Sequence, residues 1–318
     1  MNKVIAFLLS ISLAFSFTAC QAPAASGSAS SVSSTSASQQ AHQTTDPSGA
    51  KITVPETIDS IAVLAPSITE TLVALGHGDQ IVACDSSSAS LSGLPADLLT
   101  LDLMQPDMEQ LAALTPDVLF VSNMTLYDQE SPYQQLIDLG VCVICVPTSD
   151  SIADIQSDLA FIASVFGEEE KGQAMIDEMQ AELDRIGEIG KSITDKKKVY
   201  FEISAAPNLY SFGSGAFLNE MLERIGAENI LAEEQGWLPV DSETVVAANP
   251  DVILTNVNYV EDPVSEILGR SGWENITAVS TGQVYYIDNL ASSLPNQNIV
   301  KALDQMAQAI YPEYYAEQ

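Results

Sequence analysis

Side chains that could perform catalysis or hold a metal are few in this sequence. The chain contains two histidines, His42 in a Ser- and Thr-rich stretch and His77 in a Gly-His-Gly turn. One histidine in a folded body cannot supply both a catalytic triad and a metal site. No G-x-S-x-G or H-E-x-x-H pattern occurs, and the nearest run, Gly213-Ser214-Gly215, has the wrong spacing. We therefore expect a protein that is not an enzyme and that has no cofactor or metal of its own.

The cysteines of the folded part have a spacing that is typical of redox sites but an unsuitable context. Cys142 and Cys145 form a C-x-x-C pattern inside the apolar run Val141–Val146, which predicts a strand. Positions three apart on a strand point to opposite faces, so a bridge between them has poor geometry. With Cys84 the folded part holds an odd number of cysteines. We expect buried cysteines of the core.

An internal repeat places two glutamates at equivalent positions. The segment 107–119 recurs as 241–253, with Asp, Glu, Ala, Pro, Asp and Val coinciding without a gap. Each copy predicts a short helix, a Pro-Asp turn and a buried strand. Glu109 and Glu243 therefore form a pseudo-symmetric pair of carboxylates, which two arginines of a partner could bind. The alternative is that each glutamate only favours the start of a helix.

A second pair of similar segments occurs in the same order. Residues 68–76 resemble 218–226, and each segment predicts a helix that stops at a glycine. Ser67 and Glu70 have the spacing of a capping box, which predicts a helix from there to Leu75. Together with short apolar runs that predict parallel strands, the two repeats predict two α/β lobes of similar build.

Aromatic side chains and methionines gather in segments that follow predicted strands or precede predicted helices. Loops at the carboxyl ends of strands line ligand clefts in α/β folds. For each of these residues, packing in the core is the alternative. The candidates for a ligand cleft are Met104, Met124, Tyr127, Tyr210, Phe212, Trp237 and Tyr259.

Length and charge limit the class of protein. A chain of 318 residues is suited to two domains, and its 46% of hydrophobic residues suffice for a sizeable core. Eleven Lys and Arg residues against 43 Asp and Glu residues give a formal net charge of -32. That charge excludes a nucleic-acid partner and electrostatic attraction to anionic lipids.

The first fifty residues predict an export signal and a tether. Lys3 precedes an apolar run too short for a membrane span, and the segment 1–20 ends at Cys20. The end of this segment resembles the lipobox of bacterial lipoproteins, which implies a lipid on Cys20 and a place at the outer face of the cytoplasmic membrane. An ordinary secretory signal is the alternative. Residues 21–50, rich in Ser and Ala, predict a disordered linker that reaches roughly 30 Å.

The remaining chain divides at a long helical stretch. Residues 151–166 predict one helix, and residues 168–189 predict a second, about 30 Å long. We therefore expect an N-terminal lobe at 51–166, a bridging helix at 167–192 and a C-terminal lobe at 193–318.

The body resembles the substrate-binding proteins of ABC importers for cobalamin and ferric siderophores, over residues 55–312. The segments that carry the resemblance are Ala65–Gly76, Glu109–Val118, Gly213–Asn229, Trp237–Val240, Asn249–Val252 and Gly282–Tyr285. The resemblance implies two Rossmann-like lobes joined by a single long helix, with the ligand bound between them. It also implies a monomer that delivers its ligand to a permease dimer with ATPase subunits.

Individual residues take roles from this resemblance. Glu109 and Glu243 match the glutamates that meet arginines of the permease, while Tyr210 and Trp237 match the aromatic positions of the second lobe. Ser292 stands where such proteins have an arginine, and it joins the expected cleft. The loss of arginine counts against heme and catecholate siderophores, so a neutral or cationic corrinoid or hydroxamate siderophore is expected. A surface receptor or adhesion lipoprotein without a permease is the alternative.

Overall fold

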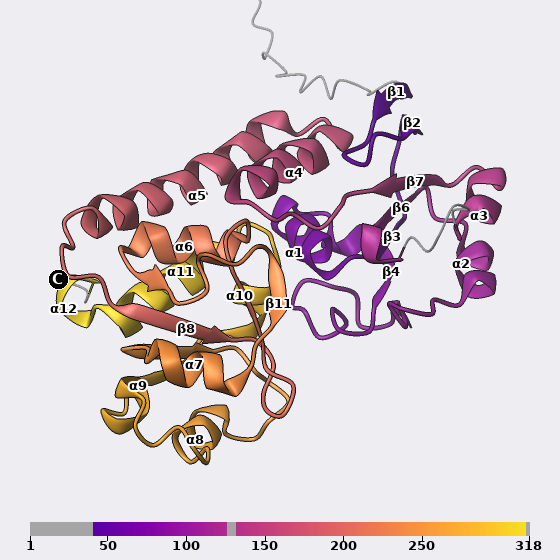
Figure 1. Cartoon of the computed structure of the whole chain (residues 1–318). Coiled ribbons are helices and arrows are strands. Elements are labelled where there is room, and N and C mark those ends of the chain that lie inside the picture. The colour runs from indigo at the N-terminus through magenta and orange to yellow at the C-terminus, as the bar shows by residue number, and fades with distance from the viewer. Residues whose placement is uncertain (1–40, 126–131, 316–318) are drawn as a thin grey trace, which may run out of the picture. The chain divides into compact units, whose positions relative to one another are not determined.

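Two parallel β-sheets with helices on both faces make up the folded body. The computed structural model describes residues 41–125 and 132–315 of the chain (Figure 1). The expected α/β fold class with two lobes is confirmed, because each sheet is parallel and has a hydrophobic cluster on either side. Within the described residues, no helix combines the length and the apolar character that a membrane span requires.

The first lobe is built on a five-stranded sheet with the order β5-β4-β3-β6-β7. The first strand of the lobe, β3, lies at the centre, so the chain winds outward on one side and then on the other. Such a reversal leaves a crevice at the carboxyl ends of the two central strands, here β3 and β6. The strands are β3 (Ile61–Leu64), β4 (Ile81–Asp85), β5 (Leu99–Leu101), β6 (Val118–Val121) and β7 (Cys142–Cys145).

Helices cover both faces of this sheet because each has one apolar side. On one face, Leu72 of α1 (Pro66–Leu75) packs with Ile162 of α4 (Ile152–Val165). On the other face, Leu111 of α2 (Met108–Leu114) packs with Leu136 of α3 (Gln134–Asp138). The two C-x-x-C cysteines follow this division, since Cys142 belongs to the first cluster and Cys145 to the second.

Helix α1 begins without the expected capping box. Its N-cap is Ala65, and Pro66 fixes the first turn at a position where no backbone N–H is needed. Glu70 does not return to the start of its own helix, because its carboxylate accepts hydrogen bonds from Asn296 and Asn298. The spacing of Ser67 and Glu70 therefore gave a wrong prediction of capping.

A β-hairpin occupies the end of the segment that was expected to be linker. Strands β1 (His42–Thr45) and β2 (Lys51–Val54) pair in antiparallel register. Asp46 orders the turn, since its Oδ1 accepts from Ala50 N at 2.9 Å. Its Oδ2 accepts from Cys145 N at 2.9 Å and so attaches the hairpin to the edge strand β7. The prediction of disorder through residue 50 is wrong for residues 42–50, because a buried aspartate supplies the order that their polar composition conceals.

The second lobe repeats this plan with four parallel strands in the order β10-β8-β12-β13. Its first strand, β8, lies between β10 and β12, which places the reversal at the carboxyl ends of β8 and β12. A separate antiparallel pair, β9 (Tyr210–Phe212) with β11 (Trp237–Pro239), lies next to this sheet. The parallel strands are β8 (Lys198–Glu202), β10 (Glu228–Asn229), β12 (Val252–Thr255) and β13 (Val284–Tyr286).

The helices of the second lobe divide between its two faces, as Figure 1 shows on either side of β8. One face packs against α6 (Phe217–Ile225), α11 (Ile299–Ile310) and α12 (Pro312–Tyr315). The opposite face packs against α7 (Ser242–Ala248), α8 (Pro263–Leu268) and α9 (Thr277–Ser280) around the buried Trp273. The short helix α10 (Asn289–Ser293) follows β13.

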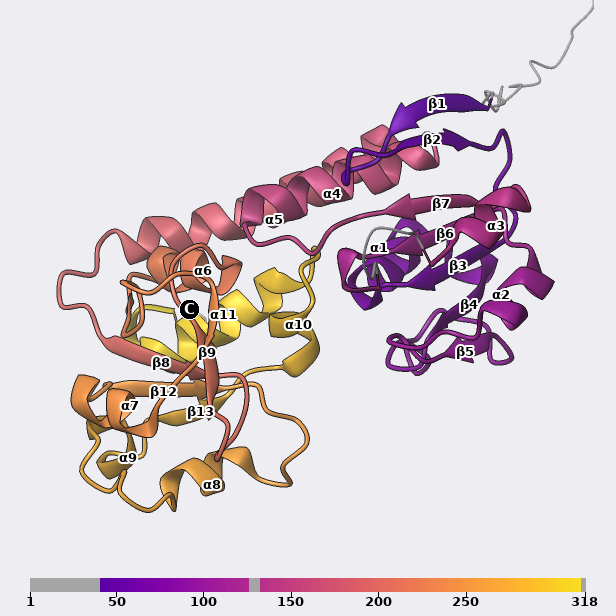
Figure 2. The ribbon, with the colours of Figure 1, turned by 45° about the vertical axis from the view of Figure 1, so that its right-hand side comes forward.

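Two helices connect the lobes. The predicted long helix is α5 (Glu169–Gly190), and α4 lies beside it (Figures 1 and 2). Ile152 and Ile155 at the start of α4 pack in the core of the second lobe, whereas Ile162 near its end packs in the core of the first. The start of α4 therefore packs in the core of the second lobe, although in chain order it belongs to the first lobe.

Candidate ligand crevices and docking faces

The predicted cleft residues of the first lobe follow the carboxyl ends of its strands. Met104 lies beyond β5, and Met124 lies in the short 3-10 helix η2 (Asn123–Thr125) directly after β6. Their side chains are 48% and 55% exposed, which is unusual for methionine in a folded body. Tyr127 lies outside the described residues. Two flexible thioether side chains thus lie at the side of the sheet where the crevice is expected.

Two aromatic side chains of the second lobe lie on the β9–β11 pair. Tyr210 and Trp237 are each 37% exposed. The Trp237 ring meets Phe212 edge-on with centroids 5.8 Å apart, and its Nε1 donates to Asp150 Oδ1 at 3.4 Å. Part of the apolar Trp237 ring is therefore exposed to solvent. Its orientation is fixed by Phe212 and by Asp150, which lies in the loop between β7 and α4.

Tyr259 supplies a third exposed ring in the second lobe. It follows β12 and is 66% exposed. Its hydroxyl accepts a hydrogen bond from Ala205 N at 2.8 Å and lies 3.1 Å from Ser204 Oγ. Because these two residues follow β8, the ring is held beside the carboxyl end of the central strand.

Two predicted cleft residues are buried and do not line a surface. Phe212 packs against Phe201 with ring centroids 5.6 Å apart and has no exposed area. Ser292 is also fully buried, and its hydroxyl donates to Asp288 O at 2.7 Å. These two predictions are wrong because sequence pattern shows neither that Trp237 covers Phe212 nor that α10 turns Ser292 inward.

Asn256 is a polar residue of this region that sequence reasoning did not single out. It follows β12, is 1% exposed, and its Nδ2 donates to Ser292 Oγ at 3.0 Å and Ser293 Oγ at 3.1 Å. Since Ser292 gives its own proton to Asp288, the amide orientation is determined. Its Oδ1 has no hydrogen-bond partner among the described residues. A polar residue directly after a buried strand was the available signal.

Arg270, the arginine in this part of the second lobe, forms ion pairs with two carboxylates. Arg270 donates to both oxygens of the buried Glu202, at 2.6 and 2.9 Å, and also pairs with Glu266. Its guanidinium lies 4.2 Å from the centre of the Trp273 ring. Arg270 is therefore neutralised before any ligand binds. Within the described residues, no group of three or more His, Cys, Asp or Glu side chains is placed to hold a metal ion.

The two glutamates of the repeat occupy the same position on equivalent helices. Glu109 is the second residue of α2 and Glu243 the second residue of α7, and both are exposed. Both helices end in a left-handed residue, Thr115 with φ 43° and Asn249 with φ 49°. Neither glutamate carboxylate has a hydrogen-bond or ion-pair partner in the part of the chain that the structure describes. Each lobe thus presents one free carboxylate on a short helix.

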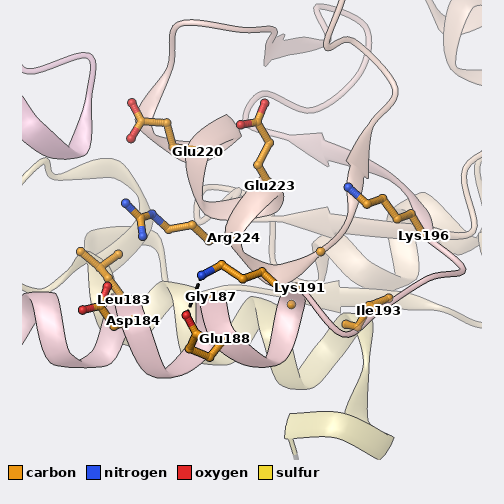
Figure 3. A pocket seen from close by; sticks show the side chains of 12 residues that line it. Leu183, Asp184, Gly187, Glu188, Lys191, Ile193, Lys196, Glu220, Glu223 and Arg224 are labelled. Carbon is orange, nitrogen blue, oxygen red and sulfur yellow. Dashed lines mark hydrogen bonds and ion pairs between the residues drawn. The ribbon is translucent and has the colours of Figure 1, made fainter.

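A pocket between α5 and α6 lies outside the expected ligand region. It has a volume of about 470 Å³ and mixes acidic with basic side chains, among them Glu220, Glu223 and Arg224 (Figure 3). Ile193 and Lys196 also line it, and they precede β8 in the chain. The pocket is therefore at the amino end of β8, whereas ligands of such sheets bind at the carboxyl end.

A smaller cavity lies where α1, α4 and the segment before α11 meet. Its volume is about 20 Å³, and Ser67, Asp158 and Asn296 are among its lining residues. Burial raises the pKa of the Asp158 carboxyl to about 6, and a hydrogen bond from Ser149 Oγ at 2.5 Å opposes that rise. The junction of the two lobes therefore contains a carboxyl group that is protonated more readily than usual.

The fold agrees with a comparison with known proteins. A family model described as periplasmic binding protein matches residues 61–291. This chain belongs to that family. Its members are binding proteins of transporters, so the protein is an extracytoplasmic substrate-binding component of an ABC transporter, which works with permease and ATPase components.

Individual relatives differ in the substrates that their names give. The chain is 28% identical to an uncharacterized ABC transporter substrate-binding lipoprotein, YvrC of Bacillus subtilis, over 86% of both chains. It is also 28% identical to the molybdate-binding protein MolA of Haemophilus influenzae, again over 86% of each. A cobalamin-binding protein of Halobacterium salinarum is 23% identical over 84% of this chain and 73% of its own length. A solved structure of MolA bound to molybdate superposes with a TM-score of 0.74, at 24% identity, over 86% of this chain and 92% of that one.

Proposed function

We propose that this periplasmic binding protein captures a neutral or cationic metal chelate between its lobes, either a cobalamin-type corrinoid or a hydroxamate siderophore. The observation that carries the proposal is the chemistry at the carboxyl ends of the strands. Thioether, aromatic and neutral amide groups gather there, and Arg270 is already paired with two carboxylates. Broad apolar rings and soft side chains suit a large chelate with apolar faces and few charges.

The same chemistry argues against an oxyanion as the ligand. Molybdate is the ligand named for one relative, and a compact dianion is best held by charge-assisted hydrogen bonds. Arg270 could serve an anion only by leaving Glu202, which would then be a buried carboxylate without its partner. That cost supports a chelate over molybdate, and it agrees with the cobalamin-binding name of another relative.

We also propose that delivery depends on Glu109 and Glu243, and that Cys20 carries a lipid at the outer face of the membrane. The free carboxylates on α2 and α7 support the first part, because two arginines of a permease dimer could bind one glutamate from each lobe. The acidity of the chain supports the second part, since a net charge of -32 requires something other than charge to hold it at a lipid surface.

Calorimetry tests the ligand class. The full chain is titrated with cyanocobalamin, ferrioxamine B, ferrichrome, hemin and sodium molybdate. We expect sub-micromolar binding of one of the first three, with an affinity about tenfold lower in Tyr259→Ala, since loss of one stacked ring is worth about 1 kcal/mol or more. Tyr314→Ala, which removes another exposed tyrosine ring, on α12, is the control. Tight binding of molybdate or hemin with no binding of the chelates would contradict the proposal.

A further inference from the structure

The first helix of each lobe carries a glutamate at the same place. Glu70 of α1 and Glu220 of α6 coincide when 68–76 is aligned with 218–226. Both helices end at a left-handed glycine, Gly76 and Gly226, each with φ 88°. Since helix and cap agree, the two glutamates occupy equivalent positions of a repeated structural unit, and their contacts can be compared directly.

Glu70 binds the segment that precedes helix α11 of the second lobe. Its Oε2 accepts hydrogen bonds from Asn296 Nδ2 and Asn298 Nδ2, both at 2.8 Å. Next to it, Thr71 Oγ1 donates to Gln297 Oε1 at 3.1 Å. Asn296 is 2% exposed, so the contact is shielded from water. Three consecutive residues of the second lobe thus bind one turn of a first-lobe helix.

The role of Asn298 shows that this contact overrides a local preference. Asn298 is the N-cap residue of α11, and asparagine is among the most favourable residues for capping. Its side chain nevertheless makes no cap hydrogen bond to α11 and donates to Glu70 of the other lobe. The interlobe bond therefore takes the place of a helix cap.

Glu220 makes the reciprocal contact. Its Oε2 accepts from Ile152 N at 3.4 Å, and Ile152 is the first residue of α4. Ser151 and Asp154 already form a capping box there, which leaves the Ile152 N–H as one of the donors without a partner in the helix. The carboxylate also lies near the positive end of the 14-residue helix. In chain order α4 comes after the last parallel strand of its lobe, β7, just as α11 comes after β13 and α10.

We propose that Glu70 and Glu220 are paired positioning residues that set the orientation of one lobe against the other. Each belongs to the first helix of its own lobe and holds the N-terminus of a helix that comes after the last parallel strand of the other lobe. The two lobes are then joined in two places, by the helices α4 and α5 and by the contact of the segment 295–298 with α1. This arrangement fixes the separation of the two docking helices, α2 and α7. It depends on the two-lobe fold and not on the identity of the ligand.

Distances between spin labels on the docking helices test the proposal without any ligand. The repeat provides equivalent exposed positions, Ala113 of α2 and Ala247 of α7. Both are changed to cysteine in full-length protein that carries Cys20→Ser, while Cys84, Cys142 and Cys145 are buried. Double electron–electron resonance then gives the distribution of distances between the lobes. We expect one narrow distribution in the parent protein.

Substitutions at Glu70, Asn298 and Glu220 separate an interlobe role from helix stability. Glu70→Ala removes both hydrogen bonds, whereas Glu70→Gln keeps an acceptor oxygen of the same reach. Asn298→Asp keeps an equally favourable capping residue for α11 but sets a carboxylate against Glu70. We expect Glu70→Ala, Asn298→Asp and Glu220→Ala to populate a second lobe arrangement roughly tenfold more than the parent does, because hydrogen bonds to charged groups are being lost.

The matched control lies one turn further along the same helix. Glu223 of α6 accepts from Asn219 Nδ2 at 2.8 Å within its own helix, and it stands beside Glu220 in Figure 3. Glu223→Ala and Glu70→Gln are expected to keep the parent distribution. An unchanged distribution in Asn298→Asp and Glu220→Ala would overturn the proposal, even if Glu70→Ala does not fold. Failure of cyanocobalamin or ferrioxamine B to bind would leave these distances, and hence this proposal, unaffected.

Discussion

Asp117 and Asp251 fasten the first strand of their lobes through the same pair of contacts. Asp117 Oδ2 accepts from Ser60 N at 2.9 Å, and Asp251 Oδ2 accepts from Lys198 N at 2.8 Å. In return, the backbone N–H of each aspartate donates to the carbonyl of the same partner, at 3.0 and 2.8 Å. The Pro-Asp turn of the repeat is therefore the element that joins the docking helix of each lobe to its central strand.

The two aspartate carboxylates accept different numbers of hydrogen bonds. Asp117 also accepts from Asp59 N and Ser60 Oγ, whereas one hydrogen bond to the Asp251 carboxylate is found in the described residues. We expect Asp117→Ala to lower the free energy of unfolding by about 2 kcal/mol and Asp251→Ala by about 1 kcal/mol. Urea unfolding followed by circular dichroism measures both. The Asn variants keep an acceptor and should lose less than half as much; equal losses for Ala and Asn would contradict this account.

The two tryptophans should respond differently to a ligand. Trp237 is 37% exposed, whereas Trp273 is fully buried and donates from Nε1 to Ser242 Oγ at 2.6 Å. Ligand binding at the carboxyl ends of the strands therefore changes the emission of Trp237 and not that of Trp273. We expect Trp273→Phe to keep the quenching by ferrioxamine B or cyanocobalamin, and Trp237→Phe to remove it. Quenching that persists in Trp237→Phe would place the ligand elsewhere.

The repeat made much of the fold predictable from sequence. The apolar run Val141–Val146 contains β7, and the buried strand predicted in each copy of the repeat is β6 or β12. The periodic stretch at 168–189 became α5 with limits shifted by one residue. These predictions succeed because burial on both faces and an apolar helix stripe leave a local pattern. The equivalence of the short helices α2 and α7 was visible for the same reason, and it extends to their left-handed end residues.

Burial of a side chain by residues that are distant in the sequence leaves no such local pattern. Tyr210 and Phe212 lie two apart on β9, which predicts a common face, yet the first is 37% exposed and the second has no exposed area. The difference arises because Trp237 and Phe217 close over one end of that short strand. Glu70 is a similar case, since a capping-box spacing concealed partners that are distant in the chain.

Uptake should depend on the docking glutamates while ligand affinity does not. Glu109 and Glu243 are exposed at the start of α2 and α7, and neither is among the methionine and aromatic side chains proposed to contact the ligand. We expect Glu109→Ala with Glu243→Ala to abolish transport into cells and to leave the calorimetric affinity unchanged. Glu56→Ala with Glu313→Ala removes the same charge from exposed positions elsewhere and is the control. Full uptake in the docking double variant would remove this assignment and favour a surface receptor that needs no permease.

The carboxyl group at the lobe junction should make stability depend on pH. Burial raises the pKa of Asp158 from an ordinary value of 3.8 to about 6 in the folded protein. Between these values the folded state binds more protons than the unfolded state, so the free energy of unfolding falls as pH rises through about 4 to 6. Above that range the loss is complete and constant. Because the carboxyl is partly exposed, we expect roughly 1–2 kcal/mol and not the full two pKa units.

Asp158→Asn isolates this contribution from the other acidic groups. Asparagine has nearly the same shape, can pair with Ser149 and does not titrate. The difference in the free energy of unfolding between parent and variant should therefore be small at pH 4 and should favour the variant above pH 6. Asp177→Asn, at an exposed position of α5, should leave the pH profile unchanged. If the free energy of unfolding changed with pH in the same way in the parent and in Asp158→Asn, the carboxyl at the lobe junction would ionise as it does in water.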